Sequence, residues 1–359
     1  MHDIMSPKME ENTMDFKKLI AAAAALSLTA CAVSCGDGQK DNTTEKATEA
    51  TTTQVTTTTA ENTTEAETTT EAIEEEDEEN YDTGDASLDN VRNQDNIGDN
   101  ELLVISFGTS YNDSRRLTIG AIEDSFEKAF PDYSVRRGFT ANIVIDHVLR
   151  RDGISIDDID AALKRATDNG VKNLVVQPTH LMNGLEYDEL TEKIADYSDA
   201  FENVAIGAPL LTSDEDFTRV EKAITDWTQE YDDGETAICF MGHGTEAASN
   251  HIYQKMQDLL TQDGFKNYYV GTVEAEPSLD DVLTKVKEGG YKKVVLEPLM
   301  VVAGDHANND MAGDDEDSWK SVFEAEGFEV ECLIRGLGEN EDIRKIYTDH
   351  AQKAIESLK

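Results

Sequence analysis

The sequence has few cysteines and few basic residues, and each shortage excludes a class of protein. Its 359 residues include only 4 cysteines, which is too few for a small scaffold held together by disulfides. Lys and Arg number 31 against 75 Asp and Glu, so the formal net charge is -44. More than half of that charge belongs to residues 101–359. Because binding to phosphates needs a basic face, we expect no nucleic-acid partner.

Two motifs of common enzymes are also missing. The segment "SFGTS" at residues 106–110 lacks the P-loop lysine and the G-x-G-x-x-G spacing, so we predict no nucleotide site there. No G-x-S-x-G elbow occurs, and serine hydrolase chemistry therefore has no support. The same segment could still present backbone N–H groups near Ser106, Gly108 and Thr109 to an anion at a helix N-terminus.

An apolar run near the start of the chain is typical of a secretory signal. In "MDFKKLIAAAAALSLTAC", two lysines precede the apolar stretch and small residues close it. The run is too short for a stable membrane-spanning helix. Its end, "LTAC", resembles a bacterial lipobox, so we predict a lipidated Cys31, with Cys35 as the weaker alternative. Residues 1–35 are therefore interpreted as signal peptide and lipobox of an extracytoplasmic protein, in contact with the membrane only through its lipid anchor.

Within residues 36–100, the stretch 40–80 consists almost entirely of Thr, Glu, Ala and Asn, as in "TTTQVTTTTAENTTEAETTTEAIEEEDEEN". This composition offers too few apolar groups to offset the entropy lost on ordering the chain. We therefore predict a disordered linker whose glutamates repel one another and keep it extended. The linker would separate the anchor from a folded part that begins near residue 101.

The folded part contains an internal duplication. "LLVISFGTS" and "TAICFMGHGTE" are both apolar strands that end in a Gly-Thr turn. "VKNLVVQPTHLMNG" and "YKKVVLEPLMVVAG" share a strand, a polar residue, a proline and a later glycine. Helical patterns separate these strands, which predicts an α/β fold with parallel sheets flanked by helices. We expect two Rossmann-like halves, 101–231 and 232–359, with ligands bound in the cleft at the carboxyl ends of the strands.

Three side chains of the second half are candidate metal ligands. His243 follows an apolar strand between two glycines, His306 follows a later strand of the same half, and Glu274 ends the strand between them. Two imidazoles and a carboxylate without cysteine suit Co²⁺, Ni²⁺, Fe²⁺ or Zn²⁺ and leave coordination positions open. The alternative is that each histidine only caps a turn by hydrogen bonding.

Other polar residues near the same edges are weaker candidates for substrate binding. His180 either contacts a ligand or packs, and Glu186 holds the place in the first repeat that His306 holds in the second. Arg136 and Arg137 either pair with substrate carboxylates or with acidic groups of the protein itself.

Several motifs together resemble a known family, the anaerobic cobalt chelatases of the CbiK type. They are "LLVISFGTSYNDSR", "RRGFTANIV", "VVQPTHLMNGLEYDEL", "CFMGHGTE", "VGTVEAEPSLDDV" and "EPLMVVAGDHANNDMAGDDEDSWKS". The resemblance covers essentially all of residues 101–359. It implies a class II chelatase fold with a tetrapyrrole in the cleft, and insertion of Co²⁺ into sirohydrochlorin during anaerobic cobalamin biosynthesis.

The resemblance also implies roles for residues of this chain. The histidines of the GHG and GDHA motifs and the glutamate between them would bind the metal, and these are His243, His306 and Glu274. We expect His243 to accept a pyrrole proton. Sirohydrochlorin carries eight carboxylates, so Arg136, Arg137 and the "SFGTS" backbone are candidate anchors for its rim. The "GFTAN" segment departs from a more usual Ala-Phe-Thr-Ser pattern.

Two functions from different classes fit the sequence. The first is an exported, lipid-anchored cobaltochelatase. The second is a surface lipoprotein that captures a tetrapyrrole or a metal for uptake without turnover. Cobalamin precursors are made in the cytoplasm, whereas this chain carries a predicted export signal, and the ligand set favours the first function. The choice among metals and the possibility of a homo-oligomer stay open.

Overall fold

The computed structural model describes residues 83–358. The predicted signal peptide, Cys31, Cys35 and most of the predicted linker lie outside these residues. The described residues belong to one compact unit. Within the described part, no helix combines the length and the apolar character that crossing a membrane requires.

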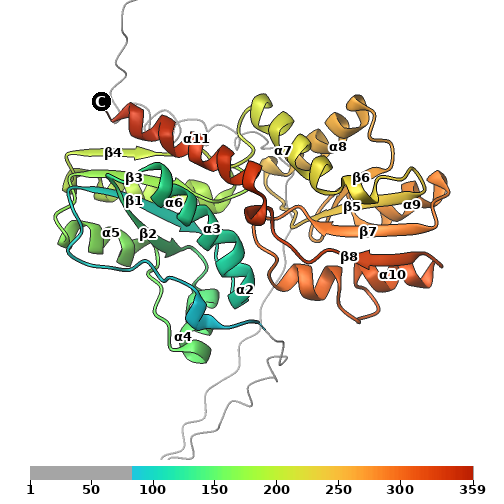
Figure 1. Cartoon of the computed structure of the whole chain (residues 1–359), viewed down its shortest axis with the longest axis horizontal. Coiled ribbons are helices and arrows are strands. Elements are labelled where there is room, and N and C mark those ends of the chain that lie inside the picture. Colours follow the sequence, from blue (N-terminus) through green and yellow to red (C-terminus); the bar gives the residue numbers. More distant parts are fainter. Residues whose placement is uncertain (1–82, 359) are drawn as a thin grey trace, which may run out of the picture. The chain divides into compact units, whose positions relative to one another are not determined.

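The first half contains a parallel four-stranded sheet with strand order β2-β1-β3-β4 (Figure 1). Its strands are β1 (Asn100–Ser106), β2 (Ser134–Phe139), β3 (Asn173–Pro178) and β4 (Asn203–Ile206). The apolar run of β1 is buried along nearly all of its length, as expected for a strand covered on both faces. The helices are α2 (Asn112–Arg115), α3 (Ala121–Ala129), α4 (Asn142–Asp152), α5 (Ile159–Asp168), α6 (Leu185–Tyr197) and α7 (Asp214–Trp227), and a π-helical turn, Arg116–Gly120, joins α2 to α3.

The second half repeats this arrangement with strand order β6-β5-β7-β8. Its strands are β5 (Thr236–Gly242), β6 (Tyr268–Thr272), β7 (Lys293–Pro298) and β8 (Glu329–Cys332). The helices are α8 (His251–Asp263), α9 (Leu279–Gly289), α10 (Trp319–Ala325) and α11 (Glu341–Ser357), with a π-helical turn at Ala307–Met311. Short 3-10 turns occur at Ala86–Leu88, Ser198–Ala200, Gln229–Tyr231, Ala248–Asn250 and Leu337–Glu339.

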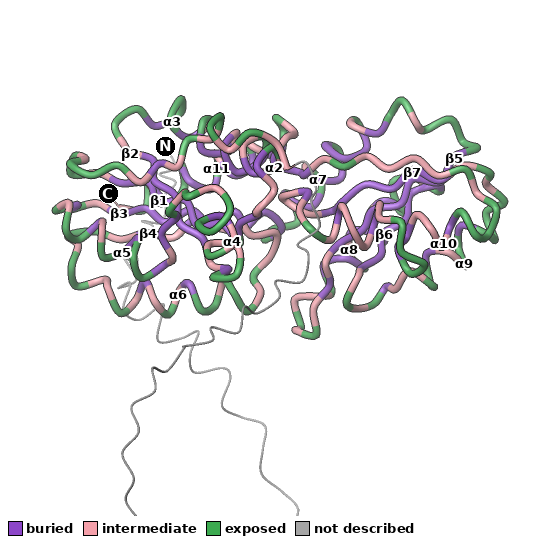
Figure 2. Tube along the Cα trace, turned by 90° about the horizontal axis from the view of Figure 1, so that it is seen from below, coloured by how far each residue is buried: buried purple, intermediate pink, exposed green. Residues whose placement is uncertain are grey.

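The two sheets have the same strand order, and each strand is parallel to its neighbours. The predicted α/β fold with two Rossmann-like halves is confirmed. Buried residues concentrate along the strands of both sheets (Figure 2). The matching order is the structural counterpart of the repeated strand-to-glycine segments in the sequence.

The strand register separates the two cysteines of the folded part. Cys239 of β5 lies opposite Leu296 of β7, and Leu296 lies opposite Cys332 of β8. The two cysteines are thus two strand spacings apart, about 10 Å, which is too far for a disulfide. Both are free thiols.

The terminal helix, α11, contacts the half that precedes it in the sequence. α11 belongs to the predicted second half, 232–359, but it packs against α3, β3 and β4 of the first half (Figure 1). The hydroxyl of Tyr347 in α11 donates to the carbonyl oxygen of Thr179, just after β3, at 2.8 Å. α7, at the end of the first half, contacts α8 of the second. The halves therefore share helices, and one apolar cluster includes Val104 of β1, Phe240 of β5 and Ile346 of α11.

The end of the predicted linker is folded, so the predicted boundary at residue 100 is wrong. Residues 83–99 pack along the first half through polar contacts and through two aliphatic side chains, Val91 and Ile97. Arg92 is buried and pairs with Glu123 at 2.8 Å and with Glu127 at 3.0 Å. Asp89 accepts hydrogen bonds from Arg115 at 2.7 Å and from Arg137 at 2.6 Å. We call residues 83–99 the N-terminal strap.

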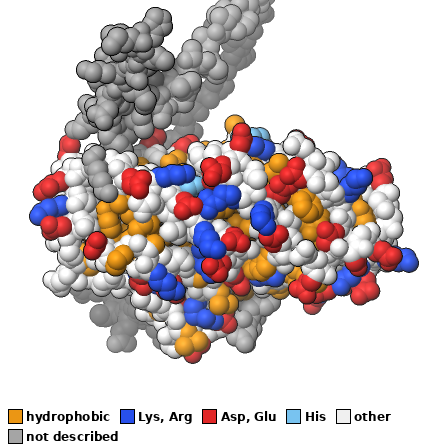
Figure 3. Space-filling view, turned by 45° about the horizontal axis from the view of Figure 1, so that its top comes forward, with side chains coloured by type: hydrophobic (Ala, Val, Ile, Leu, Met, Phe, Trp, Pro, Cys, Tyr) orange, Lys and Arg blue, Asp and Glu red, His pale blue; other side chains and the backbone are white. Residues whose placement is uncertain are grey.

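The face in Figure 3 carries acidic and basic side chains interspersed with one another. No continuous basic stripe is visible on this face of the described residues.

Candidate metal centre

Three adjacent strands of the second sheet deliver the three predicted ligands to one place. His243 directly follows β5, Glu274 follows β6, and His306 lies in the loop after β7. Since β6, β5 and β7 are neighbours and parallel, their carboxyl ends meet at one edge. One ligand atom from each residue lies within 4.8 Å of the others. The structure therefore brings together the residues that the sequence singled out.

The loops that carry His243 and Glu274 are joined by their backbones. The amide N–H of Glu274 donates to the carbonyl oxygen of His243 at 2.9 Å, and that of Val273 donates to Gly242 at 3.0 Å. The parallel pairing of β5 and β6 thus continues one step past the strands. Gly244 has φ +88°, and a β-carbon there would lie 2.8 Å from the backbone nitrogen of Ala275. Glycine is required at this position because the two loops approach each other so closely.

In both imidazole rings, Nδ1 lies within hydrogen-bond distance of an oxygen atom. Nδ1 of His243 lies 2.7 Å from the carbonyl oxygen of Gly244, and Nδ1 of His306 lies 2.7 Å from Oδ2 of Asp310. This arrangement assigns the proton to Nδ1 and leaves the Nε2 lone pair of each ring free for a metal ion. The two rings are nearly perpendicular, and their centroids are 4.6 Å apart. Oε2 of Glu274 lies 3.6 Å from Nδ1 of His243.

The centre is open to solvent on one side. The side chains of His243 and Glu274 are 45% and 54% exposed, and that of His306 is 32% exposed. Three protein ligands leave at least one position of a tetrahedral or octahedral ion vacant. An exposed, incompletely coordinated ion can be passed to another ligand, which a closed structural site does not allow.

The first half lies against the loop that carries His306. The amide N–H of Ala303 donates to Oγ of Ser114 at 3.0 Å. A β-carbon on Gly304 would lie 3.0 Å from Oγ1 of Thr109. These contacts place the "SFGTS" segment of the first half next to the metal-binding edge of the second.

His180 and Glu186 do not join the metal cluster. Both ring nitrogens of His180 are buried and have no hydrogen-bond partner among the described residues. Burial lowers the pKa of His180 to about 4, although Glu186 opposes the shift, so the ring is neutral at physiological pH. This geometry favours packing over ligand contact for His180. Glu186 is exposed in the first turn of α6.

The side chains of Ser106 and Thr109 in the "SFGTS" segment face inward. The hydroxyl of Ser106 is buried and accepts a hydrogen bond from Thr179 at 2.7 Å. Thr109 is also buried, and its Oγ1 accepts from the amide of Tyr111 at 3.3 Å. Gly108 has φ +104°, and a β-carbon there would collide with the ring of Phe139 at 2.5 Å. The hydroxyls of Ser106 and Thr109 therefore serve the fold, and a role of this segment in substrate binding would fall to its backbone.

Arg136 and Arg137 do not face the metal-binding edge, and their predicted role as substrate anchors is wrong. Both guanidinium groups are buried in the first half. Arg136 pairs with Asp157 at 3.0 Å, and Arg137 pairs with Glu123 at 2.7 Å. The second alternative from the sequence, pairing with acidic groups of the protein, is the correct one. The sequence did not predict that these two arginines are buried, because their acidic partners lie far away in the sequence.

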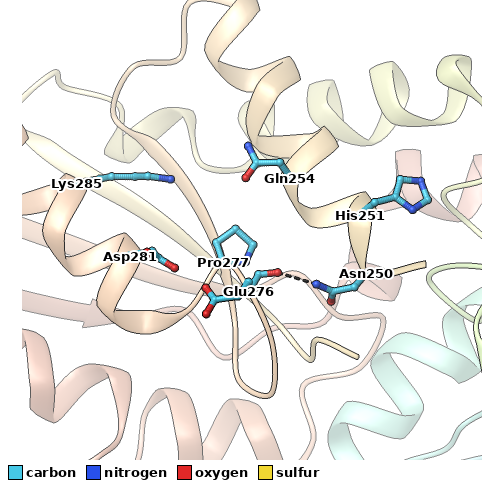
Figure 4. A pocket seen from close by; sticks show the side chains of 7 residues that line it. All are labelled: Asn250, His251, Gln254, Glu276, Pro277, Asp281 and Lys285. Atoms are coloured by element: carbon cyan, nitrogen blue, oxygen red, sulfur yellow. Dashed lines mark hydrogen bonds between the residues drawn. The ribbon is translucent and has the colours of Figure 1, made fainter. Parts of the chain in front are cut away.

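A small pocket lies beside the metal loops (Figure 4). Its volume is about 360 Å³, and none of the three metal ligands lines it. Asn250 at its rim donates to the carbonyl oxygen of Glu276 at 2.6 Å and accepts from the amide of Thr245 at 3.0 Å. Asn250 therefore bridges the loop of His243 and the loop of Glu274. Glu276, Asp281 and Lys285 line the pocket, so it carries charges of both signs.

Sequence reasoning missed two residues that hold the ligands in place, Asp310 and Asn250. Asp310 stands four residues after His306, a spacing that puts both side chains on one face of a helical turn. That spacing could have identified it. No sequence pattern identifies Asn250, since its contacts with the loops of His243 and Glu274 form only when the chain folds.

Comparison with known proteins gives this centre a context. Residues 100–356 match the family model described as cobalt chelatase (CbiK). The chain belongs to this cobalt chelatase family. The prediction that it is a metal chelatase is confirmed, with a divalent metal as substrate.

Two relatives have similar sequences along nearly their whole length. One is the sirohydrochlorin cobaltochelatase of Salmonella typhimurium, which is 36% identical over 254 residues, covering 71% of this chain and 96% of that protein. The other is the sirohydrochlorin cobaltochelatase CbiKC of Nitratidesulfovibrio vulgaris, which is 30% identical over 277 residues, covering 76% of this chain and 97% of that protein.

A solved structure shares the fold. SirB from Bacillus subtilis with Fe³⁺ superposes with a TM-score of 0.50 at 12% identity, covering 73% of this chain and 96% of that one. At this identity the likeness shows the fold alone. It agrees with the chelatase fold that the sequence motifs imply.

Proposed function

We propose that this protein is a sirohydrochlorin cobaltochelatase that is exported and held at the membrane by a lipid anchor. The observation that carries the enzymatic part is the cluster of His243, Glu274 and His306, with ligand atoms within 4.8 Å of one another at an open edge. The names of the two relatives support sirohydrochlorin as the substrate and Co²⁺ as the metal. Ni²⁺, Fe²⁺ or Zn²⁺ would accept the same ligands.

The geometry suggests how the ion is delivered. Metallation removes two pyrrole protons and moves the ion from the protein ligands to four ring nitrogens. His243, Glu274 and His306 hold the ion. As it passes to the ring nitrogens, the vacated Nε2 of His243 accepts one pyrrole proton, since its Nδ1 already faces the carbonyl oxygen of Gly244. The second proton goes to solvent at the open side of the centre. Transfer is possible because the protein fills only part of the coordination sphere.

An exposed apolar surface of the first half suits the flat face of the macrocycle. Phe107, Ile143 and Leu185 are 49%, 77% and 67% exposed. They follow β1, β2 and β3, which are neighbours in the sheet, so all three lie at its carboxyl edge. Thr109, two residues from Phe107, lies against the loop that carries His306. Burial of these side chains against a ring system would contribute to affinity.

A chelation assay tests the enzymatic proposal. The full chain in detergent, given sirohydrochlorin and Co²⁺, should accelerate the absorbance change of metallation over the spontaneous rate. His243→Ala should lower the rate by roughly 10²-fold or more, since it removes both a ligand and a proton acceptor. His251→Ala, in which an exposed histidine is lost instead, is the matched control and should keep the wild-type rate. Equal rates for the wild type and His243→Ala would refute the proposal.

Export and anchoring need a separate test, because Cys31 lies outside the described residues. The predicted lipobox supports lipidation of Cys31. Cys31→Ser should release the protein from the membrane fraction and abolish incorporation of labelled palmitate, whereas Cys35→Ser should change neither. The reverse pattern would assign the anchor to Cys35.

A second function is favoured by the predicted anchor and spacer, which are typical of surface-exposed binding proteins. In this alternative the protein captures a tetrapyrrole or a metal for uptake and performs no turnover. It predicts stoichiometric binding of sirohydrochlorin or Co²⁺ by the full chain with no more metallated product than protein. More than one product per protein molecule in the chelation assay would exclude it.

A further inference from the structure

His306 and Asp310 form a pair within one turn of the loop after β7. The π-helical turn Ala307–Met311 places Asp310 so that its Oδ2 lies 2.7 Å from Nδ1 of His306. The side chain of Asp310 is 42% exposed, and that of His306 is 32% exposed. The carboxylate of Asp310 thus binds Nδ1 of His306 and leaves the lone pair of Nε2 free.

The two histidines of the centre differ in this respect. Nδ1 of His243 faces a neutral acceptor, the backbone oxygen of Gly244, whereas Nδ1 of His306 faces a charged carboxylate. Hydrogen bonds to a charged acceptor are roughly twice as strong as neutral ones. A carboxylate behind a ligating imidazole fixes its orientation and tautomer and raises its strength as a donor. His306 should therefore be the firmer of the two imidazole ligands.

The loop itself does not depend on this carboxylate for its shape. Ala307 and Met311 are fully buried and anchor the turn in the core. The side-chain amide of Asn308 donates to the carbonyl oxygen of Gly304 at 2.7 Å. Asp305 is engaged elsewhere, since its Oδ1 accepts from Asn309 at 2.8 Å. Removing the charge of Asp310 should leave the backbone in place and free only the ring of His306.

We propose that Asp310 is a positioning residue that holds the Nε2 atom of His306 toward the incoming metal ion and makes His306 the stronger imidazole ligand. This inference rests on the proposed metal centre. It assigns no contact between Asp310 and the ion, and its effect is transmitted through the imidazole of His306.

The test is metal binding by the full chain without tetrapyrrole, with Co²⁺ as the probe. Affinity is measured by competition with a chromophoric chelator, and ligand geometry by the visible absorption band of bound Co²⁺. Asp310→Asn and Asp310→Ala should weaken Co²⁺ binding by roughly 10- to 100-fold and shift the visible band. Asp310→Glu, which keeps the charge, should recover part of the affinity. Asp305→Asn removes an equal charge from the same turn, at an exposed carboxylate that faces Asn309 and not His306, and should bind within about twofold of the wild type.

The outcomes separate this inference from the proposed function. If His306→Ala loses Co²⁺ binding while Asp310→Asn and Asp310→Ala bind as the wild type does, the role of Asp310 is overturned and the metal centre stands. Equal losses in Asp310→Asn and Asp305→Asn would also overturn it, because they would indicate a general effect of charge. If His306→Ala binds Co²⁺ like the wild type, the metal centre itself is wrong. Unchanged thermal unfolding of Asp310→Asn excludes misfolding as the cause of a loss.

Discussion

At the scale of single residues, Gly244 shows how closely the ligand loops are packed. Two separate features require glycine at this position: the φ of +88°, and the 2.8 Å that would separate a β-carbon from the backbone nitrogen of Ala275. Gly264 also has a positive φ, +97°, but a β-carbon there would meet no atom within 4 Å. Alanine at Gly264 should therefore introduce backbone strain alone, whereas alanine at Gly244 should also displace a neighbouring loop.

We predict that Gly244→Ala weakens Co²⁺ binding by roughly tenfold or more, because the new methyl group pushes the loop of Glu274 away from His243. Gly264→Ala should cost about 1 kcal/mol of stability through strain alone and leave Co²⁺ affinity unchanged. Titration with Co²⁺ and thermal unfolding of both variants measure the two effects. Equal Co²⁺ affinities in the two variants would show that the loop contact does not matter.

His180 gives a prediction on pH. Its folded-state pKa of about 4 lies below the ordinary 6.5 because the ring is buried, so the unfolded chain binds the extra proton more readily. The contribution of neutral His180 to stability is fully present above pH 6.5 and is lost as the pH falls toward 4. By pH 5 the loss amounts to about 2 kcal/mol.

Replacing His180 with Leu removes this titration. We expect the free energy of unfolding of His180→Leu to rise relative to the wild type by about 2 kcal/mol between pH 7.5 and pH 5. Urea unfolding of both proteins at the two pH values provides the measurement. A difference between the proteins that does not change with pH would contradict the assigned burial of the ring.

The metal ligands could be predicted from the sequence because each follows an apolar strand, and the carboxyl ends of parallel strands meet. Arg136 could not be interpreted in the same way. Its partners Glu101 and Asp157 come from other elements, and burial raises the pKa of Glu101 to about 7 although Arg136 opposes the shift. Sequence spacing carries no information on such pairs, and residue type alone suggested the wrong role.

At the scale of elements, the N-terminal strap is held by buried ion pairs in addition to the apolar contacts of Val91 and Ile97. Asp89 of this strap has a side chain only 2% exposed and bonds to both Arg115 and Arg137. Burial raises the pKa of Asp89, but the hydrogen bonds from the two arginines outweigh burial and the net pKa is lowered. The sequence predicted disorder here because residues 83–99 contain only three large aliphatic side chains among polar ones, and the partners of their charged groups lie far away in the sequence.

We predict that Asp89→Asn destabilises the protein by about 3 kcal/mol, because it leaves two buried guanidinium groups without their shared charge. Asp95→Asn removes an equal charge from the same strap, but Asp95 is 57% exposed in its pair with Arg165 and should cost at most about 1 kcal/mol. Chemical denaturation of the two variants gives the comparison. Similar costs would mean that the strap is not structurally coupled to the first half.

At the scale of the whole folded unit, the shared helices make the two halves interdependent. The sequence indicated the duplication and both sheets, since the strand patterns repeat. It did not indicate that α11 would pack on the first sheet, because an amphipathic helix shows that one face is buried but not against which element. Only the structure shows that α11 covers β3 and β4 and that α7 contacts α8.

This arrangement predicts one cooperative unfolding transition for both sheets. Ile346 of α11 is fully buried in the apolar cluster that includes strands of both halves. Ile346→Ala should lower stability by about 2–5 kcal/mol and shift a single calorimetric transition to lower temperature. Ile143→Ala makes the same change at a side chain that is 77% exposed and should leave the transition nearly unchanged. If the halves were independent, Ile346→Ala would split the transition into two, with the second sheet unfolding at the wild-type temperature. A single shifted transition would mean that the second sheet, which carries the metal ligands, and the first sheet, which carries the exposed apolar surface, unfold as one cooperative body.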